Sequence, residues 1–93
     1  MANFEQYAPD ILQIAKRHGV HNIRVFGSFA DGSSTPSSDL DLLVNLEPGR
    51  DLLDLIALKQ ELEELIFRKV DIVTENALSP HLRQNILRQA KAL

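Results

Sequence analysis

Apolar residues recur along the chain at two spacings, one of three to four residues and one of two. The first spacing is typical of helices that bury one face, and the second is typical of strands in a half-buried sheet. Short polar segments rich in glycine, serine and proline separate these stretches. The pattern predicts helices over 3–19, 29–32, 51–67 and 79–93, and strands over 22–26, 39–46 and 69–74.

Capping residues support the ends of the predicted helices. Gly19 follows a basic run and suits the position just after a helix, where glycine adopts a left-handed conformation. Asp51 suits the N-cap of the third helix, and Ser79 followed by Pro80 suits the start of the last. The resulting order α-β-α-β-α-β-α predicts an α/β (α+β) fold, with a small mixed sheet of about three strands flanked by helices.

Length and composition narrow the class of protein. The 93 residues fit one domain, which we expect to span 1–93. No cysteine is present, which excludes disulfides, thiolate metal sites and cysteine nucleophiles. The chain has neither a basic and apolar leader nor an apolar run of roughly 20 residues, so we expect a cytoplasmic protein with no membrane partner. A net charge of −3 disfavours direct binding of nucleic acid.

Two acidic residues interrupt the second predicted strand. Asp39 and Asp41 are two positions apart, so both carboxylates project from one face, and the alternating apolar residues Leu40, Leu42 and Val44 face the core. Neighbouring anions repel, and a central strand is a costly place for them. A divalent cation removes this conflict, because Mg²⁺ binds one or two carboxylates together with substrate phosphates. Mn²⁺ suits the same oxygen ligands.

A third carboxylate, Asp71, stands alone in the third predicted strand. If that strand lies beside the second, the three carboxylates converge and suit a site for two metal ions. Asp71 is then a candidate general base, or a ligand of the metal on the side of the nucleophile. Two structural explanations stay open: Asp39 capping a turn with Asp41 exposed at a sheet edge, and Asp71 exposed on an edge strand.

The pair Gly27-Ser28 follows the first predicted strand and opens a turn before the carboxylate strand. Glycine allows the backbone to approach a phosphate closely, and serine adds a hydroxyl donor. The segment GSFADGSSTPSSDLDLLV separates this pair from Asp39-x-Asp41 by ten residues. That arrangement resembles the nucleotidyltransferase signature of the DNA polymerase β-like superfamily.

The resemblance is greatest to the minimal nucleotidyltransferase (MNT) proteins, the antitoxins of HEPN/MNT toxin–antitoxin pairs. It covers nearly the whole chain, because VDIVTENAL contains Asp71 where the third carboxylate belongs and SPHLRQNILRQA resembles the last helix of the family. The resemblance implies a polymerase β palm-like fold. It also implies a hetero-oligomeric complex with a HEPN-domain toxin, a ribonuclease, whose chain completes a shallow site.

The resemblance further implies an activity. Some of these proteins transfer AMP from ATP to a tyrosine hydroxyl of the toxin and so silence it. Carried over by position, Gly27 and Ser28 bind the triphosphate, Asp39 and Asp41 bind Mg²⁺, and Asp71 completes the catalytic and metal-binding set.

One position departs from the family pattern. Family members often have arginine where this chain has Asp31, within a Gly-Ser-x-Ala-Arg-Gly sequence. An acidic side chain removes a cation near the triphosphate and adds repulsion, so we expect less efficient transfer. Lys69 and Arg24 are candidates to replace the missing cation.

Two other functions stay open. One is an antitoxin that occludes its toxin by surface contact without efficient transfer, which Asp31 favours and the clustered carboxylates disfavour. The other is the nucleotide-binding half of a two-chain transferase for a small molecule such as an aminoglycoside, although no additional segment is present to hold such a substrate.

Overall fold

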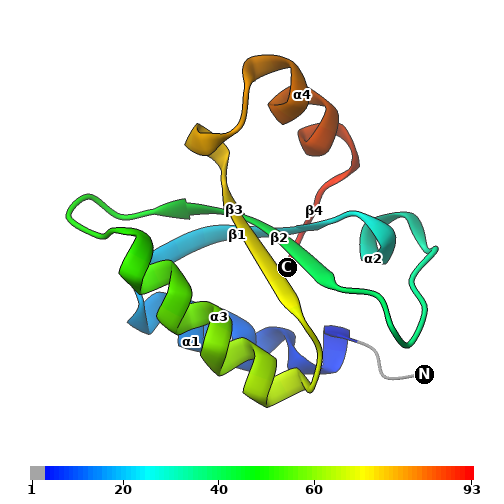
Figure 1. The fold of residues 1–93 in the computed structure, drawn as a ribbon, viewed down its shortest axis with the longest axis horizontal. Coiled ribbons are helices and arrows are strands. Elements are labelled where there is room, and N and C mark those ends of the chain that lie inside the picture. Colours follow the sequence, from blue (N-terminus) through cyan, green and yellow to red (C-terminus); the bar gives the residue numbers. More distant parts are fainter. Residues whose placement is uncertain (1–3) are drawn as a thin grey trace.

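The computed structural model describes residues 4–93, which form a four-stranded sheet with helices on both faces (Figure 1). The strands are β1 (Val20–Phe26), β2 (Leu40–Leu46), β3 (Val70–Thr74) and β4 (Lys91–Ala92). The α-helices are α1 (Ala8–Arg17), α2 (Ser28–Asp31), α3 (Leu52–Ile66) and α4 (Pro80–Gln89), and the 3₁₀ helices are η1 (Phe4–Tyr7) and η2 (Glu75–Ala77). Within residues 4–93, no helix has the length and apolar character that crossing a membrane requires.

The sheet has the strand order β3-β2-β1-β4. Strand β1 runs antiparallel to β2 and to β4, whereas β2 and β3 run parallel. Parallel neighbours need a crossover connection, and α3 supplies it between β2 and β3. The carboxylate strand β2 therefore lies between two neighbours, and the mixed sheet flanked by helices that the sequence predicts is confirmed.

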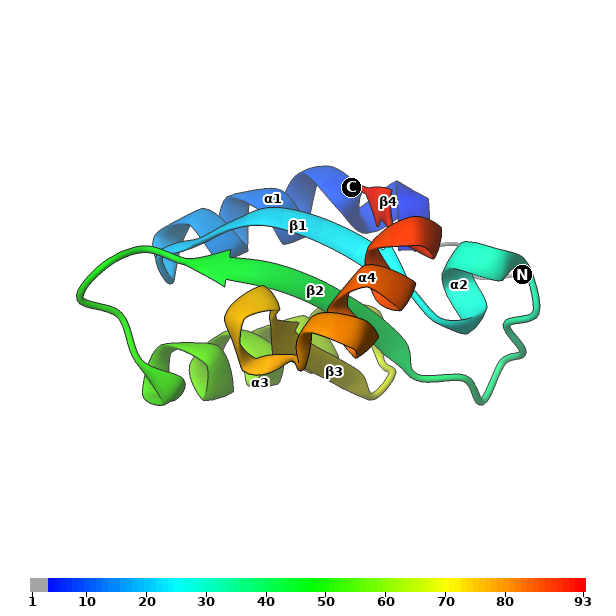
Figure 2. The same ribbon diagram turned by 90° about the horizontal axis from the view of Figure 1, so that it is seen from above.

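Helices α1 and α3 cover one face of the sheet, and α4 lies on the other (Figures 1 and 2). The alternate β2 residues Leu40, Leu42 and Val44 are fully buried in the core that α1 and α3 share with the sheet. This burial confirms the predicted alternation, and it leaves Asp41 on the opposite face. The helical spacing of apolar residues in α3 predicts a stripe that includes Ile56, but this side chain is 43% exposed because it lies beside the edge strand and not under the sheet.

The predicted caps are present. Asp51 accepts a hydrogen bond from the backbone N–H of Leu53 at 3.0 Å, and Asp54 accepts one from the N–H of Asp51 at 2.9 Å, which together form a capping box at the start of α3. Ser79 accepts from the N–H of Leu82 at 3.4 Å and caps α4. Gly19 has a φ of 71°, the left-handed conformation expected after α1.

The N-terminal helix and first strand differ from the predicted bounds. The predicted start at Asn3 lies outside the described residues, and a 3₁₀ turn precedes α1, which has Pro9 in its first turn where the missing N–H costs nothing. Strand β1 begins at Val20, two residues earlier than predicted, and contains an irregularity between His21 and Arg24. Asn22 has a φ of 55° there, so the hydrophobic alternation is interrupted and hides the start of the strand.

The C-terminal residues differ most from the prediction. Helix α4 ends at Gln89 and does not continue to Leu93, and Lys91–Ala92 form a short strand that the sequence analysis missed. Strand β4 pairs with β1, and the N–H of Leu93 donates to the carbonyl of Ile23 at 3.0 Å. The pairing covers backbone groups that β1 would otherwise expose at the sheet edge, a tertiary effect that no local pattern reveals.

Candidate functional site

The parallel pairing of β2 and β3 brings two predicted site residues together. Asp41 lies opposite Asp71 in the register, between the pairs Leu40–Val70 and Leu42–Ile72. Because side chains alternate along a strand, both carboxylates project from the sheet face opposite α1 and α3. The strand of Asp71 thus lies next to the strand of Asp41, which is the neighbour relation that the predicted convergence required.

The third carboxylate, Asp39, lies one residue before β2 starts, at the end of the serine-rich loop. Its side chain is exposed and lies outside the register that holds Asp41 and Asp71. Among residues 4–93, no three acidic or histidine side chains are already arranged to hold a metal ion. Strand pairing thus places Asp41 and Asp71 side by side, while Asp39 stays at the loop but is close enough for its charge to act on Asp41.

The charge on this face of the sheet is uncompensated. Burial raises the pKa of Asp41, and the negative charges of Asp71 and Asp39 raise it further. The ion pairs found among residues 4–93 include none of these three carboxylates. Oxygen donors with excess negative charge and no protein cation are the ligands that Mg²⁺ prefers, so the residues fit that ion.

Gly27 directly follows β1 and lies beside Asp41, because Phe26, the last residue of the strand, is the register partner of that aspartate. Its backbone has φ 73° and ψ −148°, a conformation that is essentially restricted to glycine. A Cβ atom at this position would also collide with the Asp41 carboxylate. Glycine is therefore needed for two reasons, the backbone conformation and the close approach to Asp41. Ser28 follows it as the first residue of α2.

Arg68 braces the segment between the Gly-Ser turn and β2. Its guanidinium donates hydrogen bonds to the carbonyls of Thr35 at 3.1 Å and Ser38 at 2.5 Å, and it lies 4.9 Å from the centroid of the Phe29 ring. Sequence analysis missed this residue, because its partners lie 30 or more positions away and no local pattern links them. Arg68 ties α2 and the loop to the start of β3, so it positions both halves of the signature.

Asp31 stands where the family often has arginine, and Arg24 is a candidate to replace that cation. Both residues have hydrogen-bond partners within the chain. Asp31 accepts hydrogen bonds from the N–H of Ser33 at 2.9 Å and from its hydroxyl, which lower the pKa of the carboxyl and keep it ionised. Arg24 donates to Asn45 at 2.9 Å and to Glu75 at 3.1 Å. Arg24 is therefore already engaged and is not available as the replacement cation, whereas the exposed Lys69 remains a candidate.

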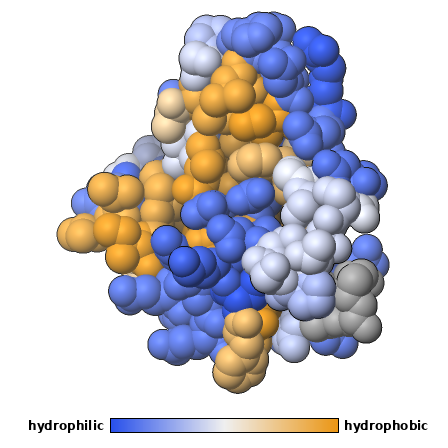
Figure 3. All heavy atoms as spheres, turned by 45° about the vertical axis from the view of Figure 1, so that its right-hand side comes forward, coloured by the Kyte–Doolittle hydropathy of each residue, from blue (hydrophilic) through white to orange (hydrophobic). Residues whose placement is uncertain are grey.

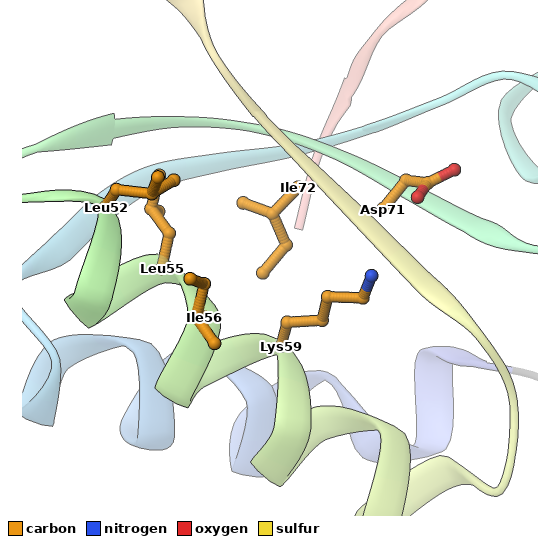
Figure 4. A pocket seen from close by; sticks show the side chains of 6 residues that line it. All are labelled: Leu52, Leu55, Ile56, Lys59, Asp71 and Ile72. Atoms are coloured by element: carbon orange, nitrogen blue, oxygen red, sulfur yellow. The ribbon is translucent and has the colours of Figure 1, made fainter.

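A cleft of about 160 Å³ opens where α3 meets the edge strand β3 (Figure 4). Its lining includes one site residue, Asp71, and one cation, Lys59. Lys59 is exposed on α3, and the sequence analysis did not single it out. The missed signal is its spacing, since Lys59 lies four residues after Leu55 and three after Ile56, on the side of the helix that lines the cleft.

Comparison with known proteins shows the family of this chain. Residues 10–93 match the family described as "Polymerase beta, Nucleotidyltransferase". A candidate protein adenylyltransferase of Methanocaldococcus jannaschii is 40% identical over 88 residues, which are 95% of each chain. The protein adenylyltransferase MntA of Thermococcus cleftensis is 36% identical over 77 residues, covering 83% of this chain and 78% of the relative.

Solved structures agree with the sequence relatives. A candidate minimal nucleotidyltransferase superposes with a TM-score of 0.89 at 46% identity, covering 100% of this chain and 97% of the other. A toxin–antitoxin crystal structure with AMP-PNP gives a TM-score of 0.78 at 26% identity, covering 90% of this chain and 69% of the other. With its Gly-Ser turn beside the carboxylates of β2 and β3, this chain belongs to the polymerase β nucleotidyltransferase family, and it is similar to the protein adenylyltransferases within that family.

Proposed function

We propose that this chain is a Mg²⁺-dependent protein adenylyltransferase that transfers AMP from ATP to a tyrosine hydroxyl of a HEPN-domain toxin, and so acts as its antitoxin. The observation that carries the proposal is the arrangement of Gly27, Asp41 and Asp71, in which a glycine turn and two paired carboxylates meet on one face of the sheet. The similarity to named protein adenylyltransferases supports the same activity.

In this proposal Asp39 and Asp41 would hold Mg²⁺, and Asp71 would either complete this ligand set or act as the general base. The bound ion would neutralise phosphate charge and lower the pKa of an attacking hydroxyl. The Gly27-Ser28 turn holds the triphosphate of ATP, because its backbone can approach the phosphates closely and the serine hydroxyl can donate to them. Catalysis then depends mainly on holding the reacting groups in line and on stabilising charge.

The chemical step is a displacement at the α-phosphorus of ATP. The acceptor oxygen forms a bond to the α-phosphorus, the bond from that phosphorus to the bridging oxygen breaks, and pyrophosphate leaves with the bonding electrons. The hydroxyl proton passes to the Asp71 carboxylate, unless Asp71 is bound to the metal, in which case it passes to solvent. Asp71 suits the acceptor side, because Asp41 lies between it and the Gly27-Ser28 turn.

Exposed apolar side chains are consistent with a protein partner. Leu52 and Leu53 are 67% and 72% exposed at the start of α3, and Phe67 is 91% exposed just after that helix. Figure 3 shows apolar side chains gathered on separate parts of the visible face, with polar ones between them. Such exposure is costly for an isolated domain and is typical of a surface that another protein covers.

A second candidate is an antitoxin that neutralises its toxin by binding alone. Asp31 favours it, because the Ser33 hydrogen bonds keep this carboxyl ionised close to the turn proposed for the triphosphate. A fixed negative charge there opposes binding of a polyanion. Asp41 and Asp71 argue against it, because occlusion does not need two carboxylates held side by side in a sheet.

One experiment separates the two candidates. The chain is mixed with the HEPN-domain protein encoded beside it, MgCl₂ and α-labelled ATP, and the partner is weighed by mass spectrometry. The transfer proposal expects the mass of at least one adenylyl group on the partner, lost in the Asp39→Asn and Asp41→Asn variants and retained in Asp10→Asn, an exposed acid on α1. Inhibition of the toxin that persists in all three variants without added mass would instead establish binding alone.

A further inference from the structure

The cleft between α3 and β3 combines apolar walls with one charged end. Leu52, Leu55, Ile56 and Lys59 contribute from α3, and Asp71 and Ile72 contribute from β3. Figure 4 shows the Ile72 side chain directed toward the leucine and isoleucine side chains of the helix, and Lys59 extending toward the strand beside Asp71. The Asp71 carboxylate stands at the rim, on the other side of the strand. The cleft is thus an apolar slot that ends at a cation and a site carboxylate.

Lys59 is not used by the fold. Within residues 4–93 it has neither a hydrogen bond nor an ion pair, whereas nearby charged residues such as Arg50, Glu61 and Arg68 all have partners. Its alkyl chain lies along the cleft and its ammonium group ends beside β3 (Figure 4). The ammonium is therefore free to interact with a group that enters the slot.

The position of the cleft identifies which substrate it faces. The strand order puts β2 between β1 and β3, so Asp41 has the Gly27-Ser28 turn on one flank and Asp71 on the other. The turn is the place proposed for the triphosphate, and the cleft borders Asp71 on the opposite flank. A group in the cleft lies on the α3 face of the sheet and meets Asp71 at the free edge of β3. This edge is on the flank away from the nucleotide phosphates, from which the acceptor in an in-line displacement must come.

We propose that this cleft is the acceptor pocket, and that it binds a phenolic side chain of the protein to be modified. The ring lies against the apolar walls, and the hydroxyl lies at the end marked by Lys59 and Asp71. The Lys59 ammonium donates a hydrogen bond to the phenolic oxygen and stabilises the negative charge that develops there as the oxygen attacks phosphorus. The proposal rests on the adenylyl transfer proposed above and adds the part of the site that selects the acceptor.

The walls fit a phenol better than the alternatives. A serine or threonine side chain has no ring to fill a slot lined by Leu52, Leu55, Ile56 and Ile72, so its hydroxyl would gain little from these contacts. An adenine base needs hydrogen-bond partners for its ring nitrogens and amino group, and four of the six lining side chains are apolar. A phenol satisfies both ends of the cleft, with its ring on the apolar walls and its hydroxyl beside the cation.

The test uses methyl and amide NMR of the full chain with two probes, the peptide Ac-Gly-Tyr-Gly-amide and the nucleotide analogue AMP-PNP with Mg²⁺. We expect the tyrosyl peptide to shift the methyl resonances of Leu55, Ile56 and Ile72, and AMP-PNP to shift the amides of Gly27 and Ser28. If AMP-PNP shifts the cleft methyls and the peptide does not, the cleft is a base pocket and the proposal is wrong.

Matched variants test the cleft itself. Ile56→Trp fills the slot, whereas Glu64→Trp adds the same side chain about two turns further along α3, at an exposed position that does not line it. Binding of the tyrosyl peptide should disappear in Ile56→Trp and persist in Glu64→Trp, with AMP-PNP binding unchanged in both. Retention of the AMP-PNP shifts shows that the variant is folded, so equal peptide binding in the two variants would overturn the proposal.

Lys59→Gln tests the role of the charge. It should weaken binding of the tyrosyl peptide by about tenfold and leave binding of Ac-Gly-Phe-Gly-amide unchanged, because only the hydroxyl meets the ammonium. An equal loss for both peptides would mean that Lys59 only shapes the cleft. Adenylyl transfer to the partner at the same rate in Ile56→Trp and Glu64→Trp would refute the pocket alone. Peptide binding without any transfer would refute the proposed function alone.

Discussion

Gly27 and Asp41 are fitted to each other at the scale of single residues. The backbone of Gly27 occupies the space beside the Asp41 carboxylate, in a conformation that other residues avoid. Gly32, at the end of α2, also has a positive φ of 81° but has nothing within 4 Å of the position of a Cβ. The two glycines therefore differ in two respects: Gly32 has the left-handed conformation with ψ 8°, whereas Gly27 has ψ −148°, and only Gly27 is crowded by the site.

We predict that Gly27→Ala destabilises the fold by about 2 kcal/mol or more, and Gly32→Ala by only about 1 kcal/mol. The difference reflects the Gly27 backbone conformation, which other residues avoid, and the collision with the Asp41 carboxylate, which has to rotate away from Gly27. Urea denaturation of both variants measures the stability, and binding of Mg²⁺ and AMP-PNP measures the site. Equal losses of stability with intact nucleotide binding in Gly27→Ala would contradict this account.

Replacing Asp41 by asparagine is expected to stabilise the protein in the absence of metal. Burial and the charges of Asp71 and Asp39 raise its pKa above the ordinary 3.8, so ionisation is less favourable in the folded chain than in the unfolded chain. The contribution of Asp41 to stability is thus fully present below pH 3.8 and is lost as pH rises through the raised pKa of the folded state. At neutral pH, Asp41→Asn removes this cost.

Thermal unfolding of Asp41→Asn and of the unmodified chain at several pH values checks this sign. The variant should unfold a few degrees higher at pH 7 without metal, and the advantage should disappear below about pH 4. Added Mg²⁺ should raise the Tm of the unmodified chain and leave the variant almost unchanged. A variant that is less stable than the unmodified chain at pH 7 would mean that Asp41 already has a compensating partner.

Residues with local signals could be predicted from the sequence, and residues defined by long-range contacts could not. The spacing of Asp39 and Asp41 and the position of Gly27-Ser28 are visible along the chain, and Asp71 is visible as a single acid in an apolar strand. Its pairing with Asp41 depends on strand order, which the sequence left open. Arg68 carried no local signal, because its partners come from α2 and the loop.

At the scale of elements, the loop over 33–38 has hydrogen bonds of its own and is tied to the rest of the fold by the Arg68 side chain. Arg68 bonds to the carbonyls of Thr35 and Ser38 and lies over the Phe29 ring, so it links the end of α3 to both ends of the loop region. The loop joins the Gly-Ser turn to Asp39, and Asp39 lies outside the strand register. The position of this carboxylate therefore depends on the loop more than on the sheet.

We predict that Arg68→Met raises the KM for ATP by about tenfold while lowering the melting temperature only slightly. The loss of a charge-assisted hydrogen bond typically corresponds to about 1.5–3 kcal/mol, and here it falls on the loop that carries Asp39. Steady-state transfer kinetics and thermal unfolding measure the two effects. Arg17→Met is the matched control, because Arg17 is an exposed cation on α1 that pairs with Glu61 away from the site. An unchanged KM would mean that the loop orders itself without Arg68.

Elements with strong periodicity and caps could also be predicted, whereas the short pairing at the C-terminus could not. The capping box of Asp51 and Asp54 and the Ser79 cap are encoded within four residues of the helix starts, so α3 and α4 begin where expected. Strand β4 has two residues and exists only because β1 offers an unpaired edge. Its formation is a property of the assembled sheet and leaves no trace in local propensity.

At the scale of the whole molecule, a chain of 93 residues has a thin margin of stability, and binding should therefore have a large effect on it. A ligand that binds only the folded state at one hundred times its Kd adds about 2.7 kcal/mol. For a domain of this size, 1 kcal/mol corresponds to roughly 4–8 °C in Tm. Nucleotide binding can thus be read from the melting temperature without any knowledge of the acceptor.

We predict that Mg²⁺ and AMP-PNP together, at about one hundred times the Kd, raise the Tm by roughly 10–20 °C, and that each alone does much less. The cooperation is expected because the phosphates and the carboxylates share the metal. Asp39→Asn should lose most of this shift in Tm. Its Tm without ligand should stay that of the unmodified chain, because Asp39 is exposed and outside the register. Asp10→Asn should keep the ligand-induced shift and the Tm without ligand. Scanning calorimetry of the three proteins decides the matter. A full shift in Asp39→Asn would remove this residue from the metal site and leave the paired Asp41 and Asp71 as its only carboxylates.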